Sequence, residues 1–221
     1  LRELSQMDQS FSKNLLEVEN IQHEELQGYI NQINECMNHA LESRQGPVVI
    51  NCSSSRMSAD ICKSHGCDLH LSAVGEANVT NKMKSLEAVY GGEGNGGPID
   101  PRVGFVRDSF VAMAQVLDAM AKNEKTIGQL AAAIPRYEIC KTKIAIDREN
   151  IQLLYAKLTE QFSDATKSTM DGLRFDWDDK WILVRPSNTE PIVRAIAEAS
   201  NESDAAALCQ VAAELAANLS S

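Results

Sequence analysis

Trp181-Ile-Leu-Val-Arg-Pro-Ser-Asn-Thr-Glu-Pro-Ile-Val-Arg194 is the most informative segment of this chain. The apolar residues Ile182 to Val184 predict a buried strand, and the polar, proline-containing cluster that follows predicts a loop. Pro186 and Pro191 stiffen this loop because each proline ring fixes its own φ angle. The segment therefore predicts a strand that delivers a rigid polar loop.

The polar side chains of this loop suit a tetrahedral anion. Two arginines offer forked guanidinium donors, and two hydroxyls and an amide can fill the remaining lone pairs of the anion. Charge-assisted, bidentate bonds of this kind are short and strong. The alternative is a proline-braced turn with surface arginines. We predict a phosphate-binding loop formed by Arg185, Ser187, Asn188, Thr189 and Arg194.

The complete motif favours a phosphate-binding loop over a plain turn. Arg-Pro-Ser-Asn-Thr-Glu-Pro-x-x-Arg, led by Trp-x-x-Val and followed by Ala-x-x-Glu-Ala, closely resembles the phosphate-binding loop of the α-D-phosphohexomutases. This family includes phosphoglucomutase, phosphomannomutase and phosphoglucosamine mutase, and the last of its four domains grips the substrate phosphate with this loop. The resemblance implies a hexose phosphate of glucose, mannose or glucosamine as the partner.

Length and charge set limits on the function. A chain of 221 residues with 43% hydrophobic residues can form one large or two ordinary domains with real cores. Its net charge of −10 argues against nucleic acid and anionic membrane surfaces as partners. No apolar run approaches the roughly 20 residues that span a bilayer. In such an acidic chain, a phosphate site needs several basic residues placed close together.

The cysteines predict reduced thiols in a cytoplasmic protein, because no Cys-x-x-Cys pair occurs among the six of them. Cys62, His65, Cys67 and His70 offer possible zinc ligands. However, a helix is expected to end at Gly66 and a strand to follow it, so the four side chains would point in different directions. We expect ordinary packing there and no metal.

Residues 46–134 predict a three-layer α/β domain with a parallel sheet. Short apolar strands are expected at 48–50, 69–73 and 88–90, and they alternate with helices. In such sheets ligands bind at the carboxyl ends of the strands. We therefore expect the loops 52–55, 75–78 and 91–100 to converge on one edge.

The third of these loops is rich in glycine. Gly92, Gly94 and Gly97 formally make Gly-x-Gly-x-x-Gly, but Pro98 and a second proline follow, so the helix of a dinucleotide site cannot begin there. The loop can still bring backbone close to a ligand. Glu93 and Asn95 suit vicinal sugar hydroxyls, and the alternative is a plain glycine turn.

The same region resembles the third domain of the phosphohexomutases. The resemblance rests on Val74-Gly75-Glu76-Ala77-Asn78-Val79, Lys82-Met83, Gly91 to Gly97 and Arg107-Asp108. In that family a Gly-Glu-x-Ser-Gly loop reads the sugar hydroxyls. The sugar-binding residues that it implies here are Gly92, Glu93, Lys82 and Asn95, which stands where many members have serine.

Residues 135–221 predict a smaller α+β domain with an antiparallel sheet. Strands are expected at 137–146, 173–175, 181–184 and 192–197, with a hairpin turning at Asp178-Asp179. Helices are expected over 151–162 and from an Asn201 cap to the C-terminal region. The resemblance equates this domain with the fourth domain of the mutases.

Residues 1–45 form a polar N-terminal segment with an expected helix from about Gln22 to Leu41. This segment more weakly resembles the stretch that joins the first two domains of the family. Because it would have nothing of its own domain to pack against, we expect a partner chain or a dimer contact there.

The family transfers a phosphoryl group between two oxygens of one hexose phosphate through a phosphoserine and magnesium. Neither the phosphoserine segment nor the aspartate-rich metal loop is found in this sequence, so no catalytic residue is assigned and no metal is expected. We interpret the chain as a partial mutase that keeps its sugar-phosphate contacts and is inactive by itself. Two alternatives are a non-catalytic phosphosugar-binding module and one half of a split enzyme.

Overall fold

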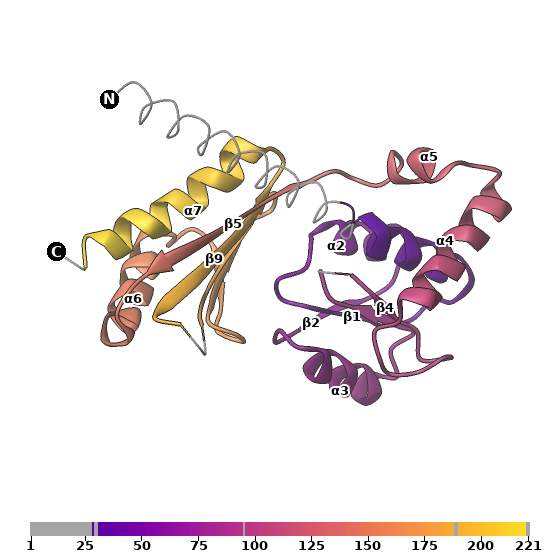
Figure 1. Cartoon of the computed structure of the whole chain (residues 1–221), viewed down its shortest axis with the longest axis horizontal. Coiled ribbons are helices and arrows are strands. Elements are labelled where there is room, and N and C mark those ends of the chain that lie inside the picture. Colours follow the sequence, from indigo (N-terminus) through magenta and orange to yellow (C-terminus); the bar gives the residue numbers. More distant parts are fainter. Residues whose placement is uncertain (1–27, 29–30, 95, 188–189, 220–221) are drawn as a thin grey trace, which may run out of the picture.

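The computed structural model describes residue 28 and residues 31–94, 96–187 and 190–219. The chain forms two units, each built on its own sheet, and Figure 1 shows them side by side. Within the described residues, no helix is both long and apolar enough to cross a membrane. Residues 1–27 and 29–30, where a partner contact was predicted, lie outside the described part of the chain.

The first unit has a four-stranded sheet in the order β2-β1-β3-β4. Its strands are β1 (Val48–Asn51), β2 (Leu69–Ser72), β3 (Tyr90–Gly92) and β4 (Pro98–Ile99). The β1, β2 and β3 strands are parallel, as the alternation of strands and helices predicted. The β4 strand is antiparallel to β3, so the sheet is mixed and not entirely parallel as predicted.

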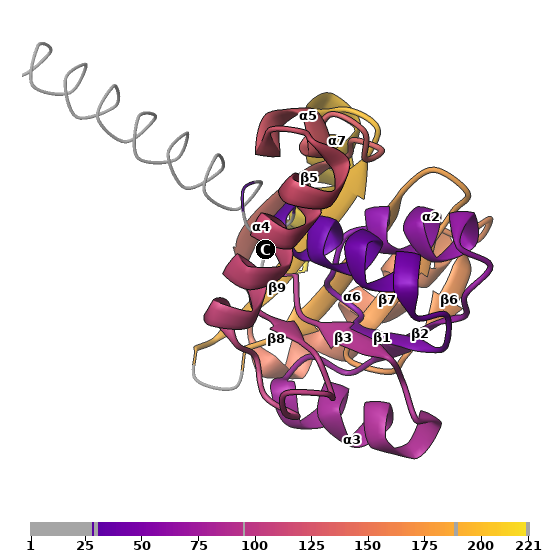
Figure 2. The same cartoon turned by 90° about the vertical axis from the view of Figure 1, so that its right-hand side faces the viewer.

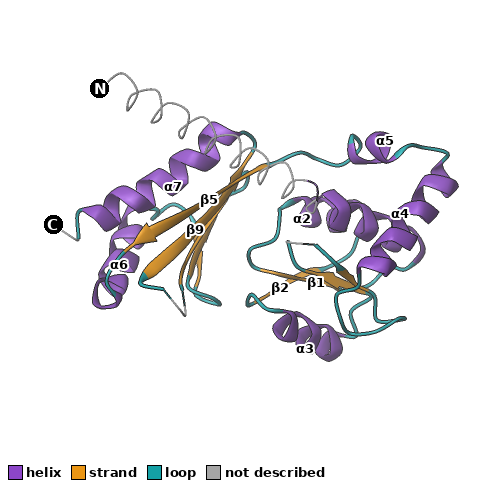
Figure 3. Cartoon of the chain, viewed as in Figure 1, coloured by secondary structure: helices purple, strands orange, loops and turns teal. Residues whose placement is uncertain are grey.

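Helices cover both faces of this sheet (Figures 2 and 3). They are the helix of residues 31–43, α2 (Met57–Ser64), α3 (Glu76–Leu86) and α4 (Ser109–Asn123). Val49 packs with Val79 and Met83 of α3 on one face. Val48 and Ile50 pack on the other face, against the three remaining helices. Alternate residues of one apolar strand thus fill two cores.

The helix of residues 31–43 belongs to the core of the first unit. Cys36, Met37 and Leu41 are buried against β1 and β3. Tyr90 donates its hydroxyl to the carbonyl of Ile33 over 3.1 Å. Residues 1–45 were predicted to be a segment separate from the first domain, but the apolar face of this helix packs on the sheet of the first unit.

Single residues mark two helix ends, and the one at Gly66 was predicted. The α2 helix ends beside Gly66, whose φ of +64° suits a residue without Cβ. Asp108 caps α4 by accepting hydrogen bonds from the backbone N–H groups of Phe110 and Val111.

Two further local features lie near the end of the first unit. The stretch 127–135 contains a short helix, α5 (Ile127–Ala131), closed by a Thr126–Gln129 capping box. The large apolar residues of α4 face outward: Phe110, Met113 and Leu117 are exposed, and small residues pack inward.

The second unit is a five-stranded antiparallel sheet in the order β5-β9-β8-β7-β6. The strands are β5 (Glu138–Ala145), β6 (Thr166–Ser168), β7 (Leu173–Asp176), β8 (Trp181–Pro186) and β9 (Ile192–Ala199). The 3₁₀ turn η1 (Arg148–Asn150) leads into α6 (Ile151–Gln161), and α7 (Glu202–Ala217) ends the unit. Both helices cover one face, and Val184, Val193 and Ala195 pack beneath them. This confirms the predicted α+β domain.

The opposite face of the second sheet packs on the first unit. Trp181, Leu183 and Ile196 form a cluster with Cys52 and Val74 from the ends of β1 and β2. The strand that carries the predicted phosphate loop therefore runs along the junction of the two units.

Polar groups fix this junction. Glu198 accepts hydrogen bonds at Oε1 from Trp181 Nε1 over 2.9 Å and from the backbone N–H of Arg56 over 2.8 Å. Burial raises the pKa of Glu198 above its usual range. Arg174 stacks its guanidinium 4.1 Å from the Trp181 ring and donates to the carbonyl of Cys52.

Candidate functional site

Arg185 and Arg194 are directly opposite each other on adjacent strands. The pairing of β8 with β9 sets Arg185 against Arg194 and Pro186 against Val193. Directly opposed residues of an antiparallel pair point to the same face, and like charges in this position repel each other. The structure thus brings together the two cations predicted for the phosphate site.

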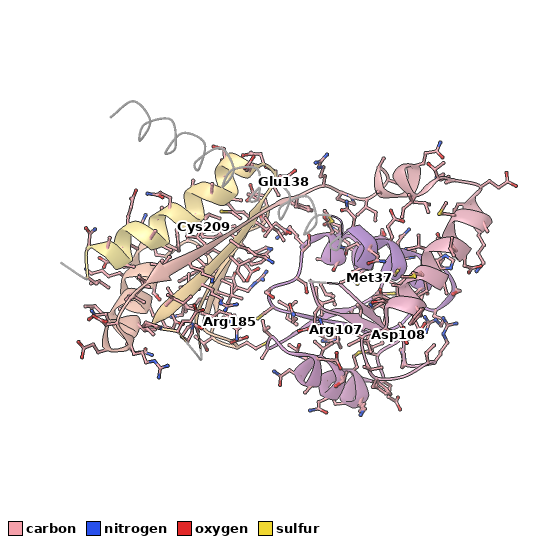
Figure 4. The ribbon with its side chains drawn as sticks, viewed as in Figure 1. Met37, Arg107, Asp108, Glu138, Arg185 and Cys209 are labelled. Carbon is pink, nitrogen blue, oxygen red and sulfur yellow. The ribbon has the colours of Figure 1, made fainter. Side chains whose placement is uncertain are left out.

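Arg185 is held at its base. Its Nε lies 3.3 Å from Oδ1 of Asp171. Gly172 has a φ of +75°, and a Cβ there would lie 2.5 Å from the carbonyl of Val184 and 2.8 Å from Cα of Arg185. Figure 4 shows Arg185 on the side of the sheet that faces the first unit. Close packing therefore holds the base of this side chain, and Asp171 provides an ion pair for its guanidinium.

Ser187 begins the loop between β8 and β9. Its backbone N–H donates to the carbonyl of Ile192 over 2.9 Å, which closes the loop. Ser187 also lines a cavity together with Arg148, Ile151 and Glu190. The other two predicted phosphate ligands, Asn188 and Thr189, lie outside the described residues.

Glu93 lies at the carboxyl edge of the first sheet and is 5% exposed. Its Oε1 accepts hydrogen bonds of 2.9 Å from Asn51 Nδ2 and from the backbone N–H of Gly75. Its Oε2 lies 3.2 Å from a terminal nitrogen of Arg107. Because a carboxylate offers about four lone-pair sites, acceptor capacity remains at Oε2.

The three loops predicted to converge do so at Glu93. Asn51, Gly75 and Glu93 end or follow β1, β2 and β3, and hydrogen bonds join them directly. Gly94 permits this approach, because a Cβ there would lie 3.0 Å from Cα of Ser54. Gly92, predicted for the sugar site, is a buried residue of β3.

Asn95 and Lys82 were also predicted as sugar ligands. Asn95 lies outside the described residues. Lys82 donates from its ammonium to the carbonyl of Leu71 within the first unit. This bond ties α3 to β2, and it does not join Lys82 to Glu93.

Asp171 connects the two predicted subsites. Its Oδ2 accepts a hydrogen bond of 2.9 Å from the backbone N–H of Val74, and its Oδ1 faces Arg185. The next residue, Gly75, donates to Glu93. A short path of polar contacts therefore leads from the arginines of the second unit to the carboxylate of the first.

Sequence reasoning missed Asp171 and Asn51 as parts of this site. Asn51 had a usable signal, since it directly follows a predicted strand at the edge where ligands bind. Asp171 had none, because its partner Val74 lies far away in sequence.

No group of three His, Cys, Asp or Glu side chains in the described part of the chain is placed to hold a metal ion. All six cysteines are free.

Family models match both units. Residues 31–137 match "Phosphoglucomutase/phosphomannomutase, alpha/beta/alpha domain III", and residues 144–216 match the C-terminal domain of the same family.

Two relatives have names from the same family. A phosphoglucomutase/phosphomannomutase of Thermococcus kodakarensis is 34% identical over 166 residues, which are 74% of this chain and 36% of the relative. A probable phosphoglucosamine mutase of Methanopyrus kandleri is 30% identical over 165 residues, 73% of this chain and 36% of the relative. The chain thus spans about a third of the length of these relatives.

Solved structures share the fold. A phosphoglucomutase/phosphomannomutase family protein of Burkholderia thailandensis superposes with a TM-score of 0.69 and 22% identity, covering 82% of this chain and 39% of that one. An Aspergillus fumigatus N-acetylphosphoglucosamine mutase in complex with GlcNAc-6P and magnesium superposes with a TM-score of 0.56 and 15% identity. The match covers 86% of this chain and 42% of that one. The chain belongs to the phosphoglucomutase/phosphomannomutase family and corresponds to its third and C-terminal domains.

Proposed function

We propose that this chain binds a hexose phosphate between its two units, as the C-terminal half of a phosphohexomutase. The observation that carries the proposal is the direct opposition of Arg185 and Arg194. Two like charges side by side repel each other, and an anion bound between them would offset this repulsion. A phosphate ester offers the charge and the oxygen geometry that forked guanidiniums match.

The hexose ring would lie towards Glu93. Its carboxylate is oriented in advance by Asn51 and Gly75, so it can accept a hydroxyl proton without reordering. Ser187 and, outside the described residues, Asn188 and Thr189 would complete the phosphate contacts. Asp171 contacts both Arg185 and the backbone of Val74, next to the loop that holds Glu93. These contacts would fix the distance between the bound phosphate and the ring.

In a phosphoryl transfer the protein mainly positions the groups and stabilises charge. The part proposed for this chain is to hold the non-reacting phosphate and the ring, so that the other end of the sugar is presented to a phosphoryl donor. The donor, magnesium and the choice among glucose, mannose and glucosamine belong to the proposed whole enzyme. A cytoplasmic location is proposed with it and is supported by the free thiols.

Titration with glucose 6-phosphate, followed by NMR of the ¹⁵N-labelled chain, tests binding. Arg185→Met should abolish measurable binding. Arg136→Met is the matched control, because its side chain is 80% exposed in the connection between the units. Unchanged binding by the Arg185 variant would refute the proposed site.

The chain alone is also proposed to be inactive. A mutase assay with a sugar bisphosphate and magnesium should show no isomerisation by the isolated chain. Clear turnover would contradict this part of the proposal.

A further inference from the structure

The arginine pair is part of a longer row of cations. The pairing of β5 with β9 sets Lys143 directly opposite Arg194, and the pairing of β9 with β8 sets Arg194 opposite Arg185. Three basic residues therefore stand side by side on three adjacent strands. Neighbouring strands lie about 4.8 Å apart, so the row is about 10 Å long between its outer backbones.

All three side chains are on the face that meets the first unit. Ile139 of β5 packs with Met57 of that unit, and residues two and four positions further along the strand share its face. Ile144, with the opposite parity, is buried in the core beneath α6 and α7. Lys143 therefore points to the same side as the arginines.

The charges along the row are unevenly compensated. Arg185 faces Asp171 at 3.3 Å, and Arg194 lies 3.7 Å from Glu190. Among the residues that the structure describes, none makes an ion pair or a hydrogen bond with Lys143, which is exposed. Lys143, at the β5 end of the row, therefore has no carboxylate partner among the described residues. It lies next to Arg194 of the predicted phosphate site.

We propose that Lys143 is a further phosphate-binding residue, the third cation of the site formed by Arg185 and Arg194. This inference rests on the proposed function. Cβ atoms of directly opposed residues are about 5 Å apart, so the flexible lysine stem reaches an oxygen of a phosphate bound at Arg194. Lysine binds as a point charge and adds to the two guanidinium forks without competing for their geometry.

A different role for Lys143 is open to test. Lysines on edge strands such as β5 prevent edge-to-edge association of sheets. That role requires no ligand, and it predicts self-association when the charge is removed.

The experiment is an NMR titration of the ¹⁵N-labelled chain with inorganic phosphate and, separately, with glucose 6-phosphate. Lys143→Met should weaken binding of both anions about tenfold, as expected for one lost charge-assisted bond. Lys143→Arg should restore most of the affinity.

The matched control is Lys167→Met on β6, the other edge of the same sheet. Lys167 is exposed and stands opposite Phe175, whose ring is in the helix-covered core, so it lies on the other face. This variant removes the same charge and should bind both anions like the wild type.

The outcomes separate the two claims. Wild-type binding by Lys143→Met, with loss of binding in Arg185→Met, would overturn the role of Lys143 and leave the phosphate site intact. Self-association of Lys143→Met in sedimentation, with unchanged binding, would overturn it in favour of edge protection. If binding depends on Lys143 but glucose 6-phosphate binds no tighter than inorganic phosphate, the inference is supported and the hexose assignment fails. A wild-type chain that binds neither anion would overturn both.

Discussion

The backbone N–H of Val74 donates a hydrogen bond of 2.9 Å to Oδ2 of Asp171, across the junction of the two units. The other oxygen of Asp171 faces Arg185 at 3.3 Å. One carboxylate thus fixes the loop beside Glu93 and the guanidinium of the phosphate site at the same time.

Asp171→Ala should uncouple sugar recognition from phosphate binding. Inorganic phosphate should bind at least as tightly as to the wild type, because a carboxylate beside the anion has been removed. The preference for glucose 6-phosphate over inorganic phosphate should shrink, because the Val74 loop loses its anchor. Both affinities are measured by titration. Asp164→Ala, which removes an exposed acceptor of Trp177 in the same unit, is the control. A preserved preference in the Asp171 variant would contradict the coupling.

Glu93→Gln should reduce the affinity for glucose 6-phosphate and leave that for inorganic phosphate nearly unchanged. The amide keeps one oxygen for Asn51 and Gly75, but it places an N–H group where Oε2 faces Arg107. The expected loss is about tenfold, the scale of one hydrogen bond to a charged group.

Glu76→Gln is the control for this change, because Glu76 pairs with the same Arg107 at 2.9 Å and is less buried. An equal loss in both variants would show that Arg107, and not the carboxylate of Glu93, determines ring binding.

Gly172→Ala should lower the free energy of unfolding and disturb Arg185. An alanine would hold a positive φ and place its Cβ against the backbone of Val184 and Arg185. Left-handed strain alone costs on the order of 1–3 kcal/mol. Urea unfolding measures the loss, and phosphate titration measures the second effect. Gly128→Ala is the control, since nothing lies within 4 Å of its added Cβ. Wild-type stability in the Gly172 variant would refute this packing argument.

The parts of the fold that were predicted correctly depend on short-range patterns. Val48 to Ile50 and Ile182 to Val184 are continuous apolar runs, and both are buried strands. The predicted helix end at Gly66 depends on that single residue. Arg185 and Arg194 were predicted together because both belong to the motif that resembles the phosphate-binding loop, and the pairing of β8 with β9 places them opposite each other.

The parts that could not be predicted depend on packing at long range. The third strand was expected at 88–90, and it runs from Tyr90 to Gly92. Glycine is poor in strands, but Gly91 is required here because a Cβ would lie 2.2 Å from Sδ of Met83. Pairing with Pro98–Ile99 then extends the sheet. Neither contact has a signal in the local sequence.

The pH dependence of stability provides a test of the helix of residues 31–43. Glu35 is 5% exposed, and its Oε1 has no hydrogen-bond partner. Burial raises the pKa of Glu35 from 4.5 to about 7. Between these values the folded chain binds more protons at Glu35 than the unfolded chain does, so its contribution to stability falls as the pH rises.

Glu35→Gln removes this titration. The variant should therefore gain stability relative to the wild type as the pH rises from 4.5 to 7, and the difference should level off above that range. The expected change is on the order of 3 kcal/mol, since one pKa unit corresponds to about 1.4 kcal/mol and the pKa of Glu35 rises from 4.5 to about 7. Urea unfolding at a series of pH values measures it. Glu149→Gln, at an exposed position of η1, should follow the wild type throughout. A constant difference between the Glu35 variant and the wild type would show that this carboxyl group titrates alike in the folded and unfolded chains, and that the helix of residues 31–43 does not bury it as the structure describes.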